Sequence, residues 1–147
     1  MPIVAMARIM AIDYGSKRSG IAVSDPQQLI AGGLTTVPTA ELEQFLANYI
    51  SKEPVTVIVL GFPTTLRGEA ATITTEITPL IERLRIRYPD IKIETMDERF
   101  TSKMAFRAMI EGGLHRKARR NKALIDQVSA TIMLEEYMEK IKQSHKS

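Results

Sequence analysis

Short apolar runs separated by turn-forming residues open the chain. These runs cover residues 9–12, 20–23 and 34–37. The first run stops at residues 13–16 (Asp-Tyr-Gly-Ser), and a polar, glycine-containing turn between two apolar segments predicts a β-hairpin. Gly32-Gly33 precedes the third run and Pro38 closes it, so we place the third strand between them. We therefore expect three antiparallel strands at the start of the fold.

The spacing of apolar residues changes after position 40. Residues 41–51 carry them at helical spacing, with Thr39 as the expected N-cap. Residues 55–60 are β-branched or apolar at every position, which is typical of a strand buried on both faces. Helical spacing returns over residues 69–88, where Pro79 is expected to kink or interrupt the helix.

Alternation and helical spacing continue to the end of the chain. Residues 91–96 alternate like a strand, and a helix is expected over residues 101–111 because Gly112-Gly113 follows. A last helix is expected over residues 121–142. Strands first, followed by strands alternating with helices, predict an α/β fold with a mixed sheet and helices on its faces.

The composition adds few constraints to this pattern. The 147 residues fit one domain, which we place over residues 1–143, followed by a polar tail over residues 144–147. The chain has no cysteine, which excludes disulfides and thiolate metal sites. No apolar run approaches the roughly 20 residues of a membrane span, and residues 1–10 lack the features of a signal peptide. We expect a cytoplasmic protein without a membrane partner.

Basic residues gather in two places, although the net charge is only +3. Residues 115–122 hold five of the 20 lysines and arginines and no acid. Arg83, Arg85 and Arg87 alternate with apolar residues. Clusters of this kind raise the affinity for a phosphate backbone. The alternative interpretation is a solvated loop and a solvated helix face, and charge alone leaves both open.

Three acidic positions stand out by their place in the predicted elements. Asp13 ends the first strand, Asp97-Glu98 follows the strand over residues 91–96, and Asp126 lies on an apolar stripe of the last helix. The stripe also contains Ala130, Met133 and Tyr137. A carboxylate is unfavourable there unless a cation meets it, and Mg²⁺ prefers oxygen ligands of this kind. Converging carboxylates could hold ions that assist phosphodiester hydrolysis.

Each acid also has a structural interpretation, which is the better one when that acid is taken singly. Asp13 is a common type of turn residue, and residues 97–99 (Asp-Glu-Arg) can form a surface ion pair. Asp126 can pair with Lys122, one helical turn earlier. The combination of the three positions is what favours a metal site. The two histidines lie in polar segments, which argues against histidine ligands.

Four blocks of the chain resemble the motifs of the YqgF/RuvX family. Residues 13–20 (Asp-Tyr-Gly-Ser-Lys-Arg-Ser-Gly) resemble its opening Asp-x-Gly-x-Lys-Arg-x-Gly motif. The other blocks are residues 61–63 with 67–68, residues 97–102, and residues 122–126 with 129–130. They follow the order and spacing of the family over nearly the whole chain. Phe100 and Ser102 replace the commoner Leu and Thr, changes that should not touch the chemistry.

The resemblance implies an RNase H-like fold, with a five-stranded mixed sheet, its first three strands antiparallel, and helices on both faces. It implies a nuclease dependent on Mg²⁺ or Mn²⁺ that matures the precursor of 16S ribosomal RNA. One alternative is a Holliday junction resolvase that cuts branched DNA, and because resolvases normally act as dimers a homodimer is an option. Another alternative is a nucleic-acid-binding factor without catalysis that acts on transcription.

The resemblance also implies residue roles. Asp13, Glu98 and Asp126 would be the catalytic metal ligands. Asp97 is the alternative to Glu98, because alternation along a strand points the two to opposite faces. The implied substrate-binding residues are Lys17, Arg18, Arg99, Arg116, Lys117, Arg119, Arg120 and Lys122.

Several of these residues have a second interpretation. Lys17 and Arg18 would hold a phosphate, or they are the solvated tip of a hairpin. Arg99 would bind phosphate or orient a neighbouring acid, and Lys122 would serve the substrate or position Asp126. Tyr14 would stack on a base or pack at the edge of the core.

Overall fold

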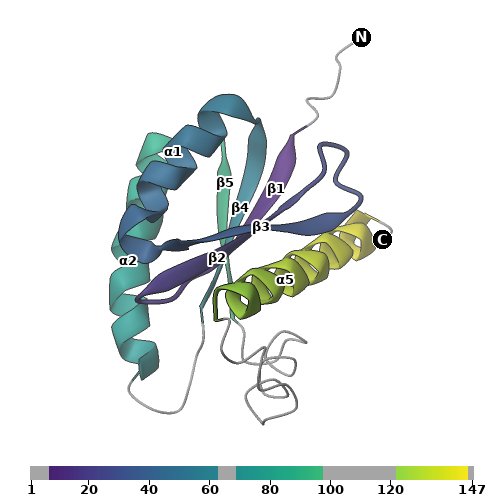
Figure 1. Cartoon of the computed structure of the whole chain (residues 1–147). Coiled ribbons are helices and arrows are strands. Elements are labelled where there is room, and N and C mark those ends of the chain that lie inside the picture. Colours follow the sequence, from purple (N-terminus) through teal and green to yellow (C-terminus); the bar gives the residue numbers. More distant parts are fainter. Residues whose placement is uncertain (1–6, 63–68, 98–121, 146–147) are drawn as a thin grey trace, which may run out of the picture.

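A five-stranded sheet forms the centre of the computed structural model, which describes residues 7–62, 69–97 and 122–145. The strands are β1 (Arg8–Asp13), β2 (Arg18–Ser24), β3 (Ala31–Pro38), β4 (Val55–Phe62) and β5 (Lys92–Asp97). They lie in the order β3-β2-β1-β4-β5 (Figure 1). β2 is antiparallel to β1 and β3, whereas β4 is parallel to β1 and β5. The predicted mixed sheet with three antiparallel strands first is confirmed.

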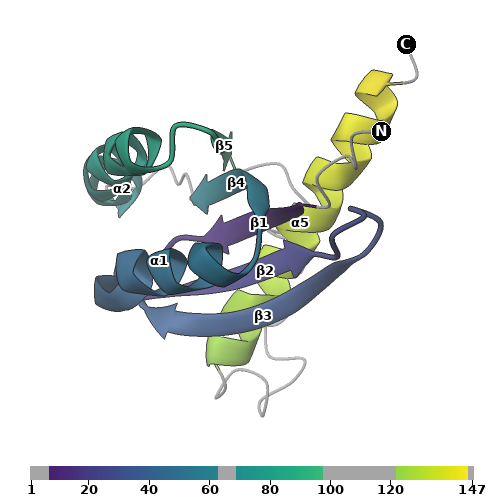
Figure 2. The same ribbon diagram turned by 90° about the horizontal axis from the view of Figure 1, so that it is seen from above.

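Helices cover both faces of this sheet. The 3-10 turn η1 (Thr39–Glu41) leads into α1 (Leu42–Lys52), which lies with α2 (Glu69–Arg87) on one face. α5 (Lys122–His145) crosses the other face (Figure 2). The helix predicted over residues 101–111 lies outside the described residues. In the described part of the chain, no helix combines the length and apolarity needed to cross a membrane.

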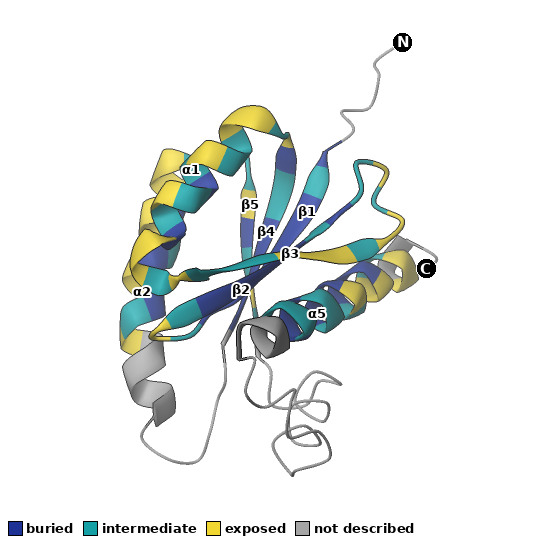
Figure 3. Cartoon of the chain, in the orientation of Figure 1, coloured by how far each residue is buried: buried dark blue, intermediate teal, exposed yellow. Residues whose placement is uncertain are grey.

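The sheet divides the core into two layers because successive strand residues point to opposite faces. In β1, Met10 and Ile12 pack on the side of α1 and α2, whereas Ile9 and Ala11 pack on the side of α5. Figure 3 shows β1 buried between these layers. β1 is thus enclosed on both faces.

Three local predictions need correction. Thr39 is not the N-cap of α1, because Glu41 holds that position without a side-chain hydrogen bond. The Thr39 hydroxyl donates instead to the carbonyl of Gly15, in the turn after β1, at 2.5 Å. α2 continues through Pro79, which is exposed, so the helix is not interrupted there. β3 begins at Ala31 and so includes the two glycines that were expected to precede it.

Candidate functional site

Asp13 is a buried carboxylate at the end of β1, where only 3% of the residue is exposed. Its register partners across the sheet are Gly20 on β2 and Gly61 on β4, and neither of these two residues has a side chain. Ile9 and Ala11 pack against α5, and the alternation of β1 directs Asp13 to that same side. Burial of a carboxylate is costly unless it is hydrogen-bonded or meets a cation. A hard cation with oxygen ligands fits this donor chemistry.

The ends of three strands meet at this edge of the sheet. Asp13 is in register with Gly61, which is in register with Met96 on β5. Two strand spacings separate the Cα atoms of Asp13 and Met96, a distance of about 10 Å. β5 ends one residue later at Asp97, opposite Phe62. Glu98, the next residue, lies outside the described residues.

α5 begins near this edge and carries Asp126 in its second turn. Ala130, Met133 and Tyr137 are buried against the sheet, which confirms the apolar stripe predicted for this helix. Asp126 lies one helical turn before Ala130 on the same stripe. Its side chain and that of Lys122 are outside what the structure describes.

Tyr14 opens the turn between β1 and β2. Its backbone N–H donates to the carbonyl of Gly61 at 3.0 Å. Its ring is buried in the core under α1 and α2, so the packing interpretation is confirmed over base stacking. Burial, followed by the nearby charge of Glu76, raises the pKa of the Tyr14 hydroxyl above its ordinary value. The phenol is therefore neutral at ordinary pH.

The rest of this turn carries the two predicted phosphate-binding residues. Lys17 is exposed and Arg18 is half-buried. A Cβ at Gly15 would lie 2.6 Å from the carbonyl oxygen of Arg18, so the tight turn requires glycine at this position. Ser16 donates to Glu76 of α2 at 2.8 Å, a contact between distant segments that no sequence motif indicated.

The other predicted basic residues divide into two groups. Arg99, Arg116, Lys117, Arg119 and Arg120 lie outside the described residues. The arginines near the end of α2 make protein contacts instead. Arg83 contacts Glu43 at 2.8 Å, and this hydrogen-bonded pair raises the pKa of the guanidinium. Arg85 donates to the carbonyl of Ile93 at 3.1 Å.

Arg87 completes this second group. Its guanidinium carbon lies 5.6 Å from the ring centre of Tyr88. With Arg83 and Arg85 also engaged, the structural interpretation of this cluster is favoured over phosphate binding. Arginine spacing alone could not reveal these partners, because two of them come from α1 and β5.

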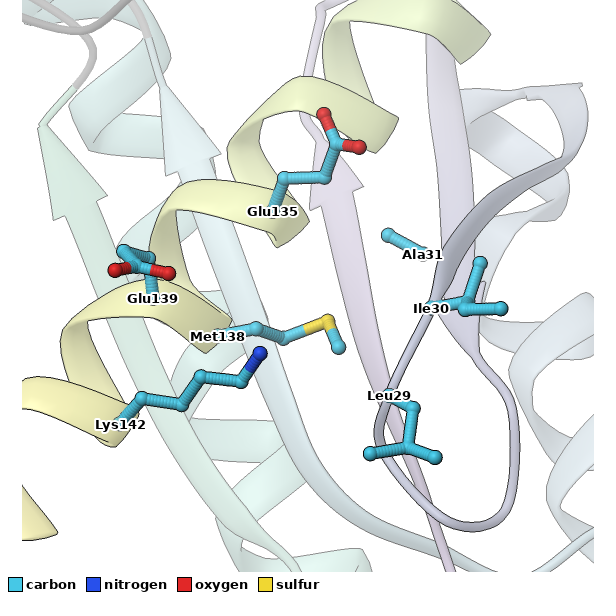
Figure 4. Close-up of a pocket in the computed structure, with 7 residues that line it drawn as sticks. All are labelled: Leu29, Ile30, Ala31, Glu135, Met138, Glu139 and Lys142. Atoms are coloured by element: carbon cyan, nitrogen blue, oxygen red, sulfur yellow. The ribbon is translucent and has the colours of Figure 1, made fainter.

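A separate hollow lies between α5 and the loop that joins β2 to β3 (Figure 4). It is lined by Leu29, Ile30, Ala31, Glu135, Met138, Glu139 and Lys142. Ala31 pairs with Ser24 at one end of β2, whereas Asp13 pairs with Gly20 near the other. The hollow is therefore distinct from the edge that holds Asp13.

Most of the chain is similar to known proteins. Residues 7–140 match the protein family described as "RuvX: Holliday junction resolvase". A protein of Bacteroides thetaiotaomicron is 54% identical over 134 residues, which cover 91% of this chain and 97% of that protein. One of Porphyromonas gingivalis is 50% identical with the same coverage. One of Flavobacterium psychrophilum is 49% identical over 133 residues, covering 90% and 97%. All three are named "Putative pre-16S rRNA nuclease".

Proposed function

This chain belongs to the RuvX family, and from that premise we propose that it is a metal-dependent nuclease that hydrolyses phosphodiester bonds of the 16S rRNA precursor. The observation that carries the proposal is the buried carboxylate of Asp13, flanked by two glycines where β1, β4 and β5 end. The relatives' name supports the RNA substrate, and ribosome maturation would place the protein in the cytoplasm. Residues 1–143 would form the single nuclease domain.

We assign the metal ligands to Asp13, Glu98 and Asp126, with Mg²⁺ or Mn²⁺ as the ion. The choice of Glu98 over Asp97 is supported by the alternation of β5. Met96 packs on the α5 side of the sheet, as does Asp13 by its own alternation, whereas Ile93 packs on the opposite side. Two residues on from Met96 is Glu98, so alternation favours it as the partner of Asp13. When bound, such ions supply an activated water and stabilise the leaving oxygen.

The basic residues would hold the phosphates of the substrate. Lys17 lies in the turn that follows Asp13 and Arg18 begins β2 directly after it, so a phosphate near that carboxylate would be within their reach. The remaining proposed contacts are Arg99, Arg116, Lys117, Arg119, Arg120 and Lys122. Contacts of this kind position a nucleic acid without reading its sequence.

Cleavage assays with a matched control test this function. The purified protein with Mg²⁺ or Mn²⁺ should cut RNA that spans an end of the 16S rRNA precursor. Asp13→Asn should lower the rate at least about 100-fold, because the charge for the cation is lost while the shape is kept. Asp90→Asn, an exposed aspartate in the turn before β5, should cut as the parent does. Equal cleavage by Asp13→Asn and parent would show that the site assignment is wrong.

The family description favours a second candidate, a nuclease for branched DNA. Competition between labelled four-way DNA junctions and precursor RNA separates the two substrates, and sedimentation of the protein tests for the homodimer that a resolvase needs. If the parent cuts neither polymer with either ion but binds RNA equally well in EDTA, the non-catalytic alternative replaces both.

A further inference from the structure

Thr39, the first residue after β3, donates two hydrogen bonds to the turn that follows Asp13. The Thr39 hydroxyl donates to the carbonyl of Gly15 at 2.5 Å. The Thr39 backbone N–H donates to the carbonyl of Lys17 at 3.0 Å. The two acceptor carbonyls belong to the residues directly before and after Ser16. Thr39 alone therefore holds both sides of the turn.

Ser19 completes this arrangement. Its hydroxyl lies 2.9 Å from that of Thr39, and it is fully buried. Because the Thr39 proton is used on Gly15, Ser19 is the donor and Thr39 the acceptor in their shared bond. The Thr39 hydroxyl therefore accepts a hydrogen bond from Ser19 while it donates one to Gly15, and these two bonds fix its orientation.

The register of the sheet brings Thr39 to this place. Arg18 pairs with Pro38 and Ser19 pairs with Val37, so the chain leaving β3 passes directly beside the turn. No motif that links this chain to its family includes Thr39. The contact arises only because two strands pair across 20 residues of sequence.

We infer that Thr39 is a positioning residue that sets the turn of Lys17 and Arg18 beside Asp13 for binding of a nucleic-acid phosphate. The inference rests on the proposed function, because it takes these basic residues as phosphate contacts. Among the described residues, the hydrogen bonds of the Thr39 hydroxyl and N–H reach two backbone carbonyls of the turn and the Ser19 hydroxyl, so Thr39 acts through the turn. Its loss would lower affinity for RNA by loosening the turn, without removing a charge.

Thr39→Val tests this, since it removes the hydroxyl and keeps the shape. In EDTA its dissociation constant for a labelled RNA from a 16S precursor end should rise about three- to tenfold, the effect of one hydrogen bond. Thr39→Ser, which keeps the hydroxyl, should bind within about twofold of the parent. Thr35→Val makes the same change on β3, opposite Ile21, and should also bind as the parent does.

A double variant separates positioning from general loosening. Since Thr39 acts through the turn that carries Lys17, adding Thr39→Val to Lys17→Ala should weaken binding little further. With Mg²⁺, Thr39→Val should raise KM and leave kcat within about twofold, whereas a displaced Asp13 would lower kcat. Any of three results would overturn the inference. Thr39→Val could bind RNA as tightly as the parent, or Thr39→Val and Thr35→Val could lose equal RNA affinity. In the third, the loss of affinity in the double variant equals the product of the losses in the two single variants. Failure of the parent to cleave would refute the nuclease alone, because the EDTA measurements need no cleavage.

Discussion

Gly33 on β3 lies directly beside the side chain of Gln127, in the second turn of α5. A Cβ at this position would lie 2.6 Å from Nε2 and 2.7 Å from Cγ of Gln127, well inside the 3.4 Å where ordinary contact begins. Gly33 is in register with Ala22, and Ala22 with Ala11, so this part of the row beneath the helix consists of three small residues. Gly32, the preceding residue, has nothing within 4 Å of its Cβ position and is the matched control.

The structure gives opposite expectations for the two alanine variants. Because Gly33 is exposed and its neighbour is a flexible side chain, moving Gln127 aside should cost about 0.5–1.5 kcal/mol, and the lower backbone entropy of the unfolded chain offsets about 0.4–1 kcal/mol of this. Gly32→Ala has only the stabilising entropy effect, because its Cβ would meet no other atom. Gly33→Ala should thus be less stable than Gly32→Ala by about 1 kcal/mol, which corresponds to a Tm lower by about 2–4 °C.

Urea denaturation followed by circular dichroism measures this difference. Gln127→Ala removes the atoms that a Cβ at Gly33 would meet, so it should rescue Gly33→Ala in a double-mutant cycle. Since Asp126 adjoins Gln127, cleavage by Gly33→Ala should fall further than its stability explains, because misplacement by about 1 Å can cost about 100-fold. Equal stability of Gly33→Ala and Gly32→Ala would show that a Cβ at Gly33 does not clash with Gln127.

Two further variants test contacts of the described core and surface. Arg83→Ala breaks the pair with Glu43, and because both side chains are over a third exposed the free energy of unfolding should fall by at most about 1 kcal/mol in urea titrations. Its RNA affinity should equal the parent's, and weaker binding would restore the phosphate interpretation. Tyr137 donates to Glu94, and burial together with this bond raises the pKa of its hydroxyl. The unfolded chain therefore releases this proton first, above pH about 10, so stability should fall as pH rises further, and less steeply in Tyr137→Phe. Parallel pH profiles for the two proteins would contradict this assignment.

The periodicity of the sequence determined most of the secondary structure and the sheet type. Strands, helices and the first hairpin follow from the alternation of apolar and polar side chains, because burial of one face is a local property of each segment. The same local pattern marked Asp13 as an acid at a strand end. It also predicted an apolar stripe on α5 that includes Asp126, and Ala130 and Met133 of this stripe are buried against the sheet.

Tertiary structure alone decided how these pieces are held together. Thr39 was expected to cap a helix, but strand pairing brings its hydroxyl to the turn after β1, where it donates to the carbonyl of Gly15. For Arg83 the sequence left phosphate binding and a solvated helix face both open, but α1 supplies Glu43 as its partner. Gly33 was expected to precede a strand, yet it lies within β3 under α5. Each of these outcomes depends on a neighbour from a distant part of the sequence. Periodicity predicts which face of its helix or strand a residue occupies, but it does not predict which side chain from another segment packs against that face.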